Sequence, residues 1–495
     1  MNTIILDGDT LTLEKLNKYL YENYSIKISN KVANKLKENR NLIKEYLKRG
    51  LPIYGINTGL GALVKSKVRA SKEKEKLIIE EHAIGFGKFV DKEIAKATIL
   101  ILTNQLAKGN SFIKIETLNR LLEIANSEYF PLIHEEGSLG ASGDLIPLAS
   151  LAQCIIGNGN FSDGKRILKG EKIFGKYDLD IGEAISLINS TAFTTASLAV
   201  YIELYKKLLD LSCGISALTA EALISNSSEF TKDALSVKRF DSQVKVGLYL
   251  LKLIENSKLI NVDKNTQDPY SIRCLPQIIG SIRNYIEIVE EHVINEMNSY
   301  SGNPVVILEK GMIYNAGNFH AQLLSFDCDI LRITIAALSS LIERKINRIL
   351  NPNLNKGLPP FLAKSEESSG LMLLQYLSAY HANQCKLLAQ PSSFNSIPTS
   401  ADQEDFSSMS GNGISLLKKS LENLKVNLAI EAYCSYEALN LRGIDRAGMG
   451  TKYIYKLIDD LVKDKAEINE KLENLFRNLE KIAELQREKF GSIFK

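Results

Sequence analysis

Hydrophobic residues recur at helical spacing through the C-terminal part of the chain. One stripe, with a period close to 3.6 residues, consists of Ile454, Leu457, Ile458, Leu461 and Val462. A second stripe consists of Ile468, Leu472, Leu475, Phe476, Leu479, Ile482 and Ala483. From about residue 190 onward most of the sequence has this character, and only 11 prolines occur in 495 residues. Because proline interrupts helices, this pattern predicts a mainly α protein with long helices.

The first third of the chain has a different pattern. Short apolar stretches alternate with glycines, and strand-like alternation is scarce. Helical spacing predicts helices at about residues 92–108 and 113–125. We therefore predict two regions: a smaller mixed N-terminal region over residues 1–195 and a long-helix bundle over residues 196–495.

Composition and charge are typical of a soluble globular protein. Hydrophobic residues make up 45% and charged residues 24% of the chain. The net charge is +3, from 61 Lys and Arg against 58 Asp and Glu, which gives no reason to expect a nucleic-acid partner. The densest basic run, residues 65–76, mixes Lys and Arg with Ser and Glu. We interpret this run as a solvated helix face or a mobile loop.

The cysteines and the N-terminus bear on where the protein acts. Six cysteines lie far apart without a CxxC pair, so we expect neither a metal site nor a disulfide framework. The first residues do not resemble a signal peptide, and apolar runs fall short of the 18 or so residues that span a bilayer. We expect a protein of the reducing cytoplasm without a membrane partner.

The segment Gly140-Ala141-Ser142-Gly143-Asp144 carries unusual chemical potential. Gly143 lacks the Cβ that would keep its amide nitrogen away from the carbonyl of Ala141. If that nitrogen attacked the carbonyl, the carbonyl oxygen would leave as one water as the ring closed. Ser142 could then lose its hydroxyl as a second water and leave a methylidene group. The product would be an electrophile made from the chain itself. Taken alone, the same residues also fit an ordinary turn.

Five further motifs accompany this segment along the chain. They are Tyr54-Gly55-Ile56-Asn57-Thr58-Gly59-Leu60-Gly61, Leu187-Ile188-Asn189, the stretch from Gln267 to Gln277, Gly317-Asn318-Phe319-His320, and the stretch from Pro398 to Asp405. In this order they resemble the histidine and aromatic amino-acid ammonia-lyase family over nearly the whole chain. The resemblance implies the long-helix fold of the ammonia-lyase/fumarase-like superfamily. It also implies a homotetramer whose active sites combine loops from more than one subunit.

The resemblance assigns chemistry to several residues around the electrophile. In this family the Ala-Ser-Gly triplet, here Ala141, Ser142 and Gly143, becomes 4-methylidene-imidazol-5-one without an exogenous cofactor or metal. The enzymes then expel ammonia from an α-amino acid to give an unsaturated acid. Asp144 would assist the cyclisation, although its position also fits a helix cap. Tyr54 is our candidate for the base that takes the β-proton, provided that its surroundings lower a pKa normally near 10.

Other residues would bind the amino-acid part of the substrate. Arg273 has the planar donor group that matches a carboxylate in two hydrogen bonds. By resemblance, Asn189 and Gln267 support the carboxylate and the amino group, and Tyr270 is a second hydroxyl near the electrophile. Phe319 would pack beside the electrophile.

His82 and Glu404 favour histidine as the substrate. By resemblance, His82 occupies a substrate-selecting position that is His in histidine lyases and commonly Leu in phenylalanine lyases. Glu404 can accept a hydrogen bond from an imidazole N–H, and Met372 also matches the histidine branch. We therefore expect conversion of L-histidine to trans-urocanate and ammonia.

Several positions depart from the histidine branch, namely Glu81, Ser150, Leu275, Gln322 and Phe406. These departures leave a tyrosine or phenylalanine ammonia-lyase, or a 2,3-aminomutase that uses the same electrophile, as alternatives. An enzyme acting on a histidine-like betaine and a non-catalytic relative are weaker alternatives, because the triplet 141–143 and the other candidate residues are all present.

Overall fold

The computed structural model describes residues 2–22, 24–263 and 266–495, and these form two compact units. The first unit comprises residues 1–200, 289–329 and 391–415. The second comprises residues 201–288, 330–390 and 416–495. Each unit is therefore assembled from separate stretches of sequence. The predicted division into domains after residue 195 stays a prediction.

The first unit contains most of the short elements. Its helices are α1 (Leu13–Tyr21), α2 (Asn30–Lys48), η1 (Gly61–Lys65), α3 (Lys72–His82), α4 (Lys92–Ala107), α5 (Ile115–Ala125), α6 (Leu145–Ile155), α7 (Gly170–Phe174), α8 (Glu183–Ile188) and η3 (Leu308–Lys310). Its strands are β1 (Asn2–Leu6), β2 (Tyr24–Ile28), β3 (Phe86–Phe89), β4 (Phe130–Pro131), β5 (His134–Glu136), β6 (Asn160–Ser162), β7 (Ile167–Lys169), β8 (Val305–Ile307) and β9 (Met312–Tyr314). The predicted helices at 92–108 and 113–125 are confirmed as α4 and α5.

The strands form small sheets at the margins of the helices. β1 pairs with β2 in parallel, with Ile4 opposite Ile26. The antiparallel pairings are β3 with β5, β4 with β6, β6 with β7, and β8 with β9. The short strands contrast with a helix content of 60%, which confirms the mainly α fold.

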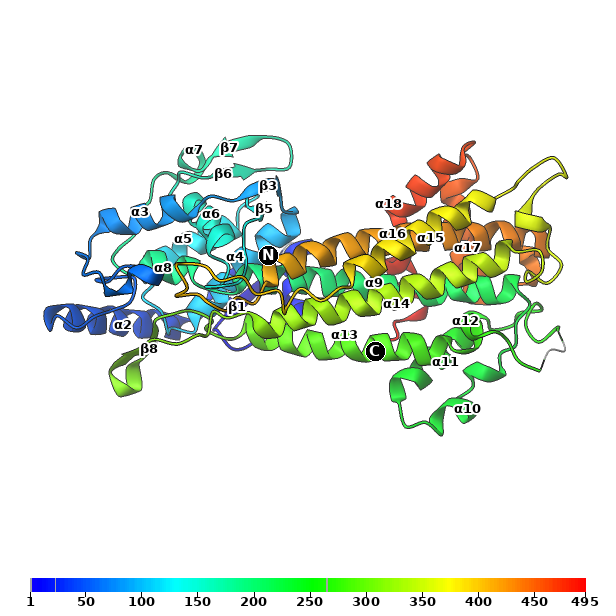
Figure 1. Cartoon of the computed structure of the whole chain (residues 1–495), viewed down its shortest axis with the longest axis horizontal. Coiled ribbons are helices and arrows are strands. Elements are labelled where there is room, and N and C mark those ends of the chain that lie inside the picture. Colours follow the sequence, from blue (N-terminus) through cyan, green and yellow to red (C-terminus); the bar gives the residue numbers. More distant parts are fainter. Residues whose placement is uncertain (1, 23, 264–265) are drawn as a thin grey trace. The chain divides into compact units, whose positions relative to one another are not determined.

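Four long helices contribute residues to both units. They are α9 (Ala192–Ala222), α13 (Leu275–Met297), α14 (Gln322–Leu350) and α16 (Ser410–Arg442), drawn as long ribbons in Figure 1. The stretch 183–222 is long and apolar enough to cross a membrane. However, 94% of its most apolar window is buried within the described structure, as in the core helix of a globular fold.

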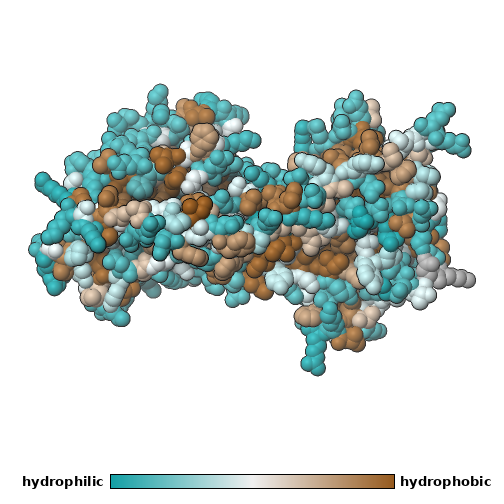
Figure 2. Space-filling model, in the orientation of Figure 1, coloured by the Kyte–Doolittle hydropathy of each residue, from teal (hydrophilic) through white to brown (hydrophobic). Residues whose placement is uncertain are grey.

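The remaining helices belong to the second unit. They are η2 (Ser228–Phe230), α10 (Lys232–Ser236), α11 (Asp241–Leu253), α12 (Tyr270–Arg273), η4 (Pro360–Leu362), α15 (Met372–Leu388), η5 (Ile444–Arg446), α17 (Met449–Val462) and α18 (Ile468–Phe490). Most of the residues in the stripes predicted at the C-terminus are buried or half-buried on one face of α17 and α18, including Ile454, Ile458, Leu475 and Leu479. Ile468, the first residue of α18, is an exception and is exposed. The surface combines hydrophilic residues with apolar patches (Figure 2).

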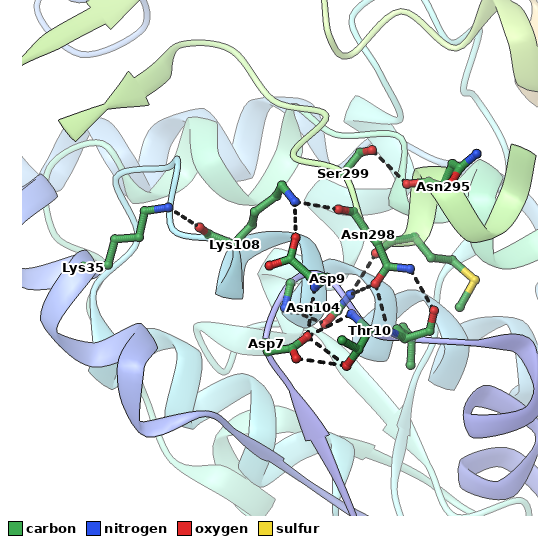
Figure 3. Close-up of polar contacts among 12 residues, drawn as sticks. Asp7, Asp9, Thr10, Lys35, Asn104, Lys108, Asn295, Asn298 and Ser299 are labelled. Carbon is green, nitrogen blue, oxygen red and sulfur yellow. Dashed lines mark hydrogen bonds and ion pairs between the residues drawn. The ribbon is translucent and has the colours of Figure 1, made fainter. Parts of the chain in front are cut away.

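Polar contacts fix the C-terminal end of α4 within the first unit (Figure 3). Lys108 donates to the carboxylate of Asp9 at 2.5 Å and to the carbonyl of Asn298 at 3.0 Å. Lys35 in turn donates to the carbonyl of Lys108 at 2.8 Å. Asn104, one helical turn earlier, accepts from the amide of Gly8 at 3.1 Å. These contacts hold the turn of α4 that also carries Gln105.

Candidate active site

Tyr54 lies on a loop, residues 53–61, which we call the base loop. Its neighbours Ile53 and Ile56 are buried in a hydrophobic cluster with Phe112 and Ile185. Gly55 has φ of +72°, a conformation that glycine adopts without the strain of a Cβ. The loop is therefore anchored in the core on both sides of Tyr54.

The hydroxyl oxygen of Tyr54 accepts a hydrogen bond from the backbone N–H of Gly61 at 2.9 Å. Burial raises the pKa of Tyr54, the Gly61 N–H lowers it, and the charge of Glu404 raises it further, with a net increase. A tyrosine that acts as a base must lose its proton. Positive potential from outside these contacts is therefore required for Tyr54 to work near neutral pH.

The Ala141-Ser142-Gly143 turn is tightly enclosed. Gly143 has φ of +70°, and a Cβ there would lie 2.6 Å from the carbonyl oxygen of Ser190. The side-chain amide of Asn189 donates to the Ser142 carbonyl at 2.8 Å and approaches its hydroxyl oxygen at 2.9 Å. The structure thus brings Asn189, predicted from its motif, directly against the residue that would become the electrophile.

Asp144 is fully buried and follows this turn at the start of α6. It occupies the N-cap position of α6, as its place in the sequence also allowed, but its side chain makes no capping hydrogen bond. Instead its carboxylate accepts from the Thr194 amide (2.8 Å), the Thr194 hydroxyl (2.7 Å) and the Ser138 hydroxyl (3.0 Å). Burial raises the pKa of Asp144 to about 6, against the opposing effect of these donors.

A buried polar network binds the segment 189–191 through the side chains of Gln105, Glu296 and Ser301. The Ser190 hydroxyl donates to the side chain of Gln105 at 2.7 Å. The Ser301 hydroxyl accepts from the Thr191 amide at 3.1 Å, and Thr191 donates to Glu296. The sequence analysis did not identify Gln105, Glu296 or Ser301, although Gln105 is a polar residue within the apolar pattern of α4.

Two cavities adjoin the turn, with volumes of about 580 and 420 Å³. Both are lined by Tyr54, Gly61, Ser142 and Glu404. The larger one is also lined by Leu60, Leu63, Val68, Lys74, Leu77, Ile78, Glu81, His82, Leu145, Ile185 and Ser400. The smaller one also includes Asn303, Gly317, Phe319 and Gln403. The structure therefore brings together the predicted base, electrophile, ring-binding pair and Phe319.

His82 and Glu404 present two hydrogen-bond acceptors to the larger cavity. Nδ1 of His82 lies 2.7 Å from the carbonyl oxygen of Ile78. Because a carbonyl can only accept, Nδ1 is the donor in this contact, which leaves Nε2 as the ring nitrogen for another partner, an acceptor in this tautomer of imidazole. Glu404 is half-buried, and Oε2 accepts from the Thr399 hydroxyl at 3.1 Å. Glu81 also lines this cavity and is exposed.

The loop that carries Glu404 contacts the base loop. Ser400, Ala401 and Asp402 all have positive φ, between 49° and 64°. The Ser400 hydroxyl accepts from the Ala62 amide at 3.1 Å. It also lies 2.1 Å from where a Cβ of Gly61 would stand. Gly61 is therefore required at this contact, because a larger residue would collide with Ser400.

The start of α3 contradicts our interpretation of the basic run. Lys74 is half-buried, and its ammonium donates to the carbonyls of Gly55, Ile56 and Thr58 at 3.0, 2.9 and 2.8 Å. Burial lowers the pKa of Lys74. Glu75 is buried and accepts from the amides of Gly182 and Ala184, both at 2.8 Å, and burial raises its pKa to about 7. The solvated face that we predicted from composition is wrong for these two residues.

Three of the residues predicted to bind the amino-acid part of the substrate, Gln267, Tyr270 and Arg273, belong to the second unit, whereas Asn189 belongs to the first. Tyr270 and Arg273 begin and end α12, and Tyr270 is 71% exposed. The guanidinium of Arg273 lies 4.9 Å from the centre of the Tyr270 ring and donates to the side chain of the exposed Gln267. These three residues therefore form a cluster of their own, which we call the clamp segment, residues 267–273.

Two further residues named from the sequence lie outside both cavities' lining. Phe406 is 59% exposed and stacks against His320, with 6.1 Å between ring centres. Met372 is the first residue of α15 in the second unit. Neither residue contributes to the described surface around Ser142.

Comparison with known proteins agrees with this geometry. The profile of the family described as aromatic amino acid lyase matches residues 11–460. A histidine ammonia-lyase of Shouchella clausii (strain KSM-K16) is 34% identical over 463 residues, which cover 91% of this chain and 92% of the relative. The crystal structure of histidine ammonia-lyase from Trypanosoma cruzi has a TM-score of 0.87 and 27% identity, covering 99% of this chain and 95% of that one. Tyrosine aminomutase from Streptomyces globisporus has a TM-score of 0.92 and 25% identity, covering 98% of each chain.

The chain belongs to the aromatic amino acid lyase family. It is an enzyme, a carbon–nitrogen lyase with ammonia-lyase activity.

Proposed function

We propose that the enzyme converts L-histidine to trans-urocanate and ammonia. The observation that carries this proposal is the larger cavity, where His82 and Glu404 line the same space as Tyr54 and Ser142. Nε2 of His82 and the carboxylate of Glu404 are two acceptors, and an imidazolium ring supplies two N–H donors to match them. A phenyl ring would offer neither acceptor a donor, and Glu404 would keep only its bond from the Thr399 hydroxyl, which is unfavourable in a half-buried site.

The enclosed turn fits a 4-methylidene-imidazol-5-one group formed from Ala141, Ser142 and Gly143. Gly143 has no Cβ and lies against the Ser190 carbonyl, and Asn189 donates to both oxygens of Ser142. Oδ1 of Asn189 is buried and has no hydrogen-bond partner among the described residues, so a polar group beside Ser142 could use it. When present, this group supplies an electrophile that takes up electron density from the substrate.

The chain's own residues would move the proton. Tyr54 lines both cavities with its hydroxyl held by the Gly61 amide, and we assign it the removal of the β-proton of the substrate. Because burial and Glu404 raise its pKa, this role requires additional positive charge near the phenol oxygen in the working enzyme. Phe319, from the smaller cavity, would pack against the reacting group.

The carboxylate of the substrate needs a cationic partner, and the described lining of the two cavities contains no lysine or arginine with an unused donor. Lys74 is the one lysine or arginine in that lining, and its three N–H groups already bind backbone carbonyls. We therefore propose that Arg273 grips the carboxylate, supported by Gln267 and Tyr270, and that assembly into a homotetramer brings a clamp segment to each site.

Exposed apolar residues on α15 support self-association. They recur at helical spacing and include Leu373, Tyr376, Leu377 and Tyr380, which are 37–65% exposed. A second copy of the chain would bury this face. We also place the enzyme in the cytoplasm, because all six cysteines are free thiols, as expected in a reducing compartment.

A specific observation favours a second candidate. The larger cavity has an apolar side that includes Leu60, Leu63, Val68 and Leu77, and this side would accept a phenyl ring. Tyrosine or phenylalanine is thus the alternative substrate. The product would be the unsaturated acid, or the β-amino acid if the enzyme returned ammonia as a 2,3-aminomutase.

The test compares L-histidine, L-tyrosine and L-phenylalanine with the purified enzyme, identifying each product by mass. Intact mass of the same preparation should show the loss of two water molecules from the chain. We expect urocanate and the highest kcat/KM with histidine. A tenfold preference for tyrosine, about 1.4 kcal/mol in transition-state stabilisation, would overturn the substrate assignment and leave the lyase class intact.

A further inference from the structure

The base loop is held by a single lysine from a neighbouring helix. Lys74 lies in the first turn of α3, where Ser71 accepts a hydrogen bond from its backbone N–H at 3.3 Å. Its ammonium reaches across to the carbonyls of Gly55, Ile56 and Thr58, at 2.8–3.0 Å. All three of these acceptors lie within four residues of Tyr54. The lysine therefore binds the segment of backbone that carries the predicted base.

The geometry of these contacts separates Lys74 from substrate binding. An ammonium has three donors and no acceptor. Each donor is directed to a different backbone carbonyl, so none is left for a substrate carboxylate. Lys74 lines the cavity, but all three of its hydrogen bonds go to backbone carbonyls of the base loop and none is directed to a molecule in the cavity.

The carbonyls also depend on Lys74. Residues 53–61 have no regular strand or helix to satisfy their backbone groups before η1, and Gly55 and Gly61 both have positive φ. Inside the loop, the Gly55 amide donates to the Thr58 hydroxyl at 3.1 Å, and the Asn57 amide side chain donates to Leu51 at 2.9 Å. These bonds set local turns. Backbone bonds also join the loop to the segment that follows it, from the Gly59 amide to the Ser66 carbonyl and from the Val68 amide to the Asn57 carbonyl, both at 3.1 Å. The ammonium adds a bond from α3 to each of three loop carbonyls.

We propose that Lys74 is a positioning residue for Tyr54, fixing the base loop so that the phenol stands ready for proton transfer. The inference rests on the proposed role of Tyr54 as the base. It concerns the placement of the base and not the formation of the electrophile, because Lys74 makes none of its side-chain bonds to residues 141–144. Misplacing a catalytic group by about 1 Å can cost 100-fold in rate.

The experiment replaces Lys74 by Met, which keeps much of the length and removes all three donors. Lys76→Met is the matched control, because Lys76 is an exposed lysine on the same helix that pairs at 3.5 Å with Glu80. For Lys74→Met we expect kcat to fall about 30- to 100-fold with KM changed less than about threefold. The loss of two waters by intact mass should match the wild type. Lys76→Met should match the wild type in every measurement.

Hydrogen exchange tests the same inference without activity. In Lys74→Met, peptides covering residues 53–61 should exchange faster than in the wild type, while peptides from α6 should be unchanged. Lys74→Cys followed by treatment with 2-bromoethylamine restores an ammonium at nearly the same reach. We expect this treatment to recover at least tenfold of the lost kcat, with treated wild type as the control for the native cysteines.

The outcomes are decisive in both directions. Turnover of Lys74→Met within twofold of the wild type, unchanged exchange in residues 53–61, or no recovery after alkylation of Lys74→Cys would each overturn the proposal. Loss of cooperative unfolding in both Lys74→Met and Lys74→Cys would also overturn the proposal, since Lys74 would then be needed for the fold as a whole. If the wild type itself lost no water and released no ammonia, the proposed function would fail, and hydrogen exchange would still decide the role of Lys74.

Discussion

The base loop and the clamp segment both carry groups that we assign to the substrate, yet they are held very differently. The base loop is anchored by buried Ile53 and Ile56, by the Gly61 amide and by the ammonium of Lys74. The clamp segment is exposed at Gln267 and Tyr270, and Arg273 contacts mainly these neighbours. The comparison indicates that the proton-transfer side of the site is organised within one unit of the fold. The clamp segment is held within the second unit by the buried Asp268, which accepts from the Asn226 amide at 2.6 Å, while the groups that we assign to the carboxylate are more exposed.

The largest effect should come from the organised side. Ser142→Ala removes the hydroxyl that would leave as water, while the bond from Asn189 to the backbone carbonyl of residue 142 and the packing of Gly143 against Ser190 stay in place. We expect turnover to fall by about three orders of magnitude or more, as expected when the main electrostatic contribution to catalysis is lost. Intact mass should show that the chain no longer loses two waters. Near-normal turnover would contradict the assignment of the electrophile.

A smaller but still large effect is expected from the clamp segment. Arg273→Leu removes the charged hydrogen bonds to the substrate carboxylate, and we expect kcat/KM to fall by about 100-fold or more, chiefly through KM. The exposed Arg239, also in the second unit, provides a control as Arg239→Leu. Unchanged kinetics of Arg273→Leu would remove the clamp from the proposed mechanism.

Mixing two inactive variants sharpens the same comparison. If the clamp of one subunit serves the electrophile of another, refolded mixtures of Ser142→Ala and Arg273→Leu should regain part of the wild-type activity. Such hybrids contain sites with an intact Ser142 from one chain and an intact Arg273 from the other. Activity that stayed at the level of the separate variants would place clamp and electrophile in one chain.

Glu404 should show an intermediate effect. Glu404→Gln keeps the shape of the side chain and removes its charge, so we expect a loss of about 2 to 3 kcal/mol in transition-state binding of histidine. The measurement is kcat/KM for histidine and for phenylalanine. The ratio should shift towards phenylalanine, whose ring makes no bond to the carboxylate. An equal loss for both substrates would show that Glu404 acts on the loop and not on the ring.

The smallest predicted effect concerns stability and Asp144. Its pKa in the fold, about 6, lies above the ordinary value of 3.8, so the protonated form is favoured in the folded state. The resulting stabilisation is complete below pH 3.8 and is lost as the pH rises through 6. Between pH 5 and pH 8 the wild type should therefore lose about 1 to 1.5 kcal/mol of unfolding free energy relative to Asp144→Asn. Urea unfolding of both proteins at the two pH values measures this difference.

The helices could be predicted from the sequence for a simple physical reason, whereas the roles of the motif residues stay predictions. The stripes of α17 and α18 follow directly from burial of one helix face, so spacing alone was sufficient. Tyr54, Ser142, Asn189 and Glu404 were found because each lies in a short motif of the family. The motifs alone could not show how these residues are arranged. In the structure, Tyr54, Ser142 and Glu404 line the same cavity, and Asn189 contacts Ser142.

The residues that the sequence did not reveal act through contacts between distant segments. Lys74 and Glu75 belong to a run of alternating charges that looks like a solvated helix face. The Lys74 side chain binds the base loop, and the Glu75 side chain binds amides at the start of α8. Local composition does not show which distant segment a charged side chain will contact. The partners of the Asp144 side chain were hidden for a related reason: its carboxylate accepts from Thr194, about 50 residues away in the chain, and not from the amides of its own helix.

Gly61 has a consequence for how this enzyme could be engineered. Its N–H holds the Tyr54 hydroxyl, and its missing Cβ leaves the place taken by Ser400 on the Glu404 loop. Substitutions that reshape the ring pocket near residue 400 will therefore disturb the base through this glycine. Directed evolution of substrate range should meet strong epistasis between the two loops, with beneficial changes failing to add. Libraries that vary residues 54–61 and 399–404 together will explore productive combinations that one-loop libraries exclude.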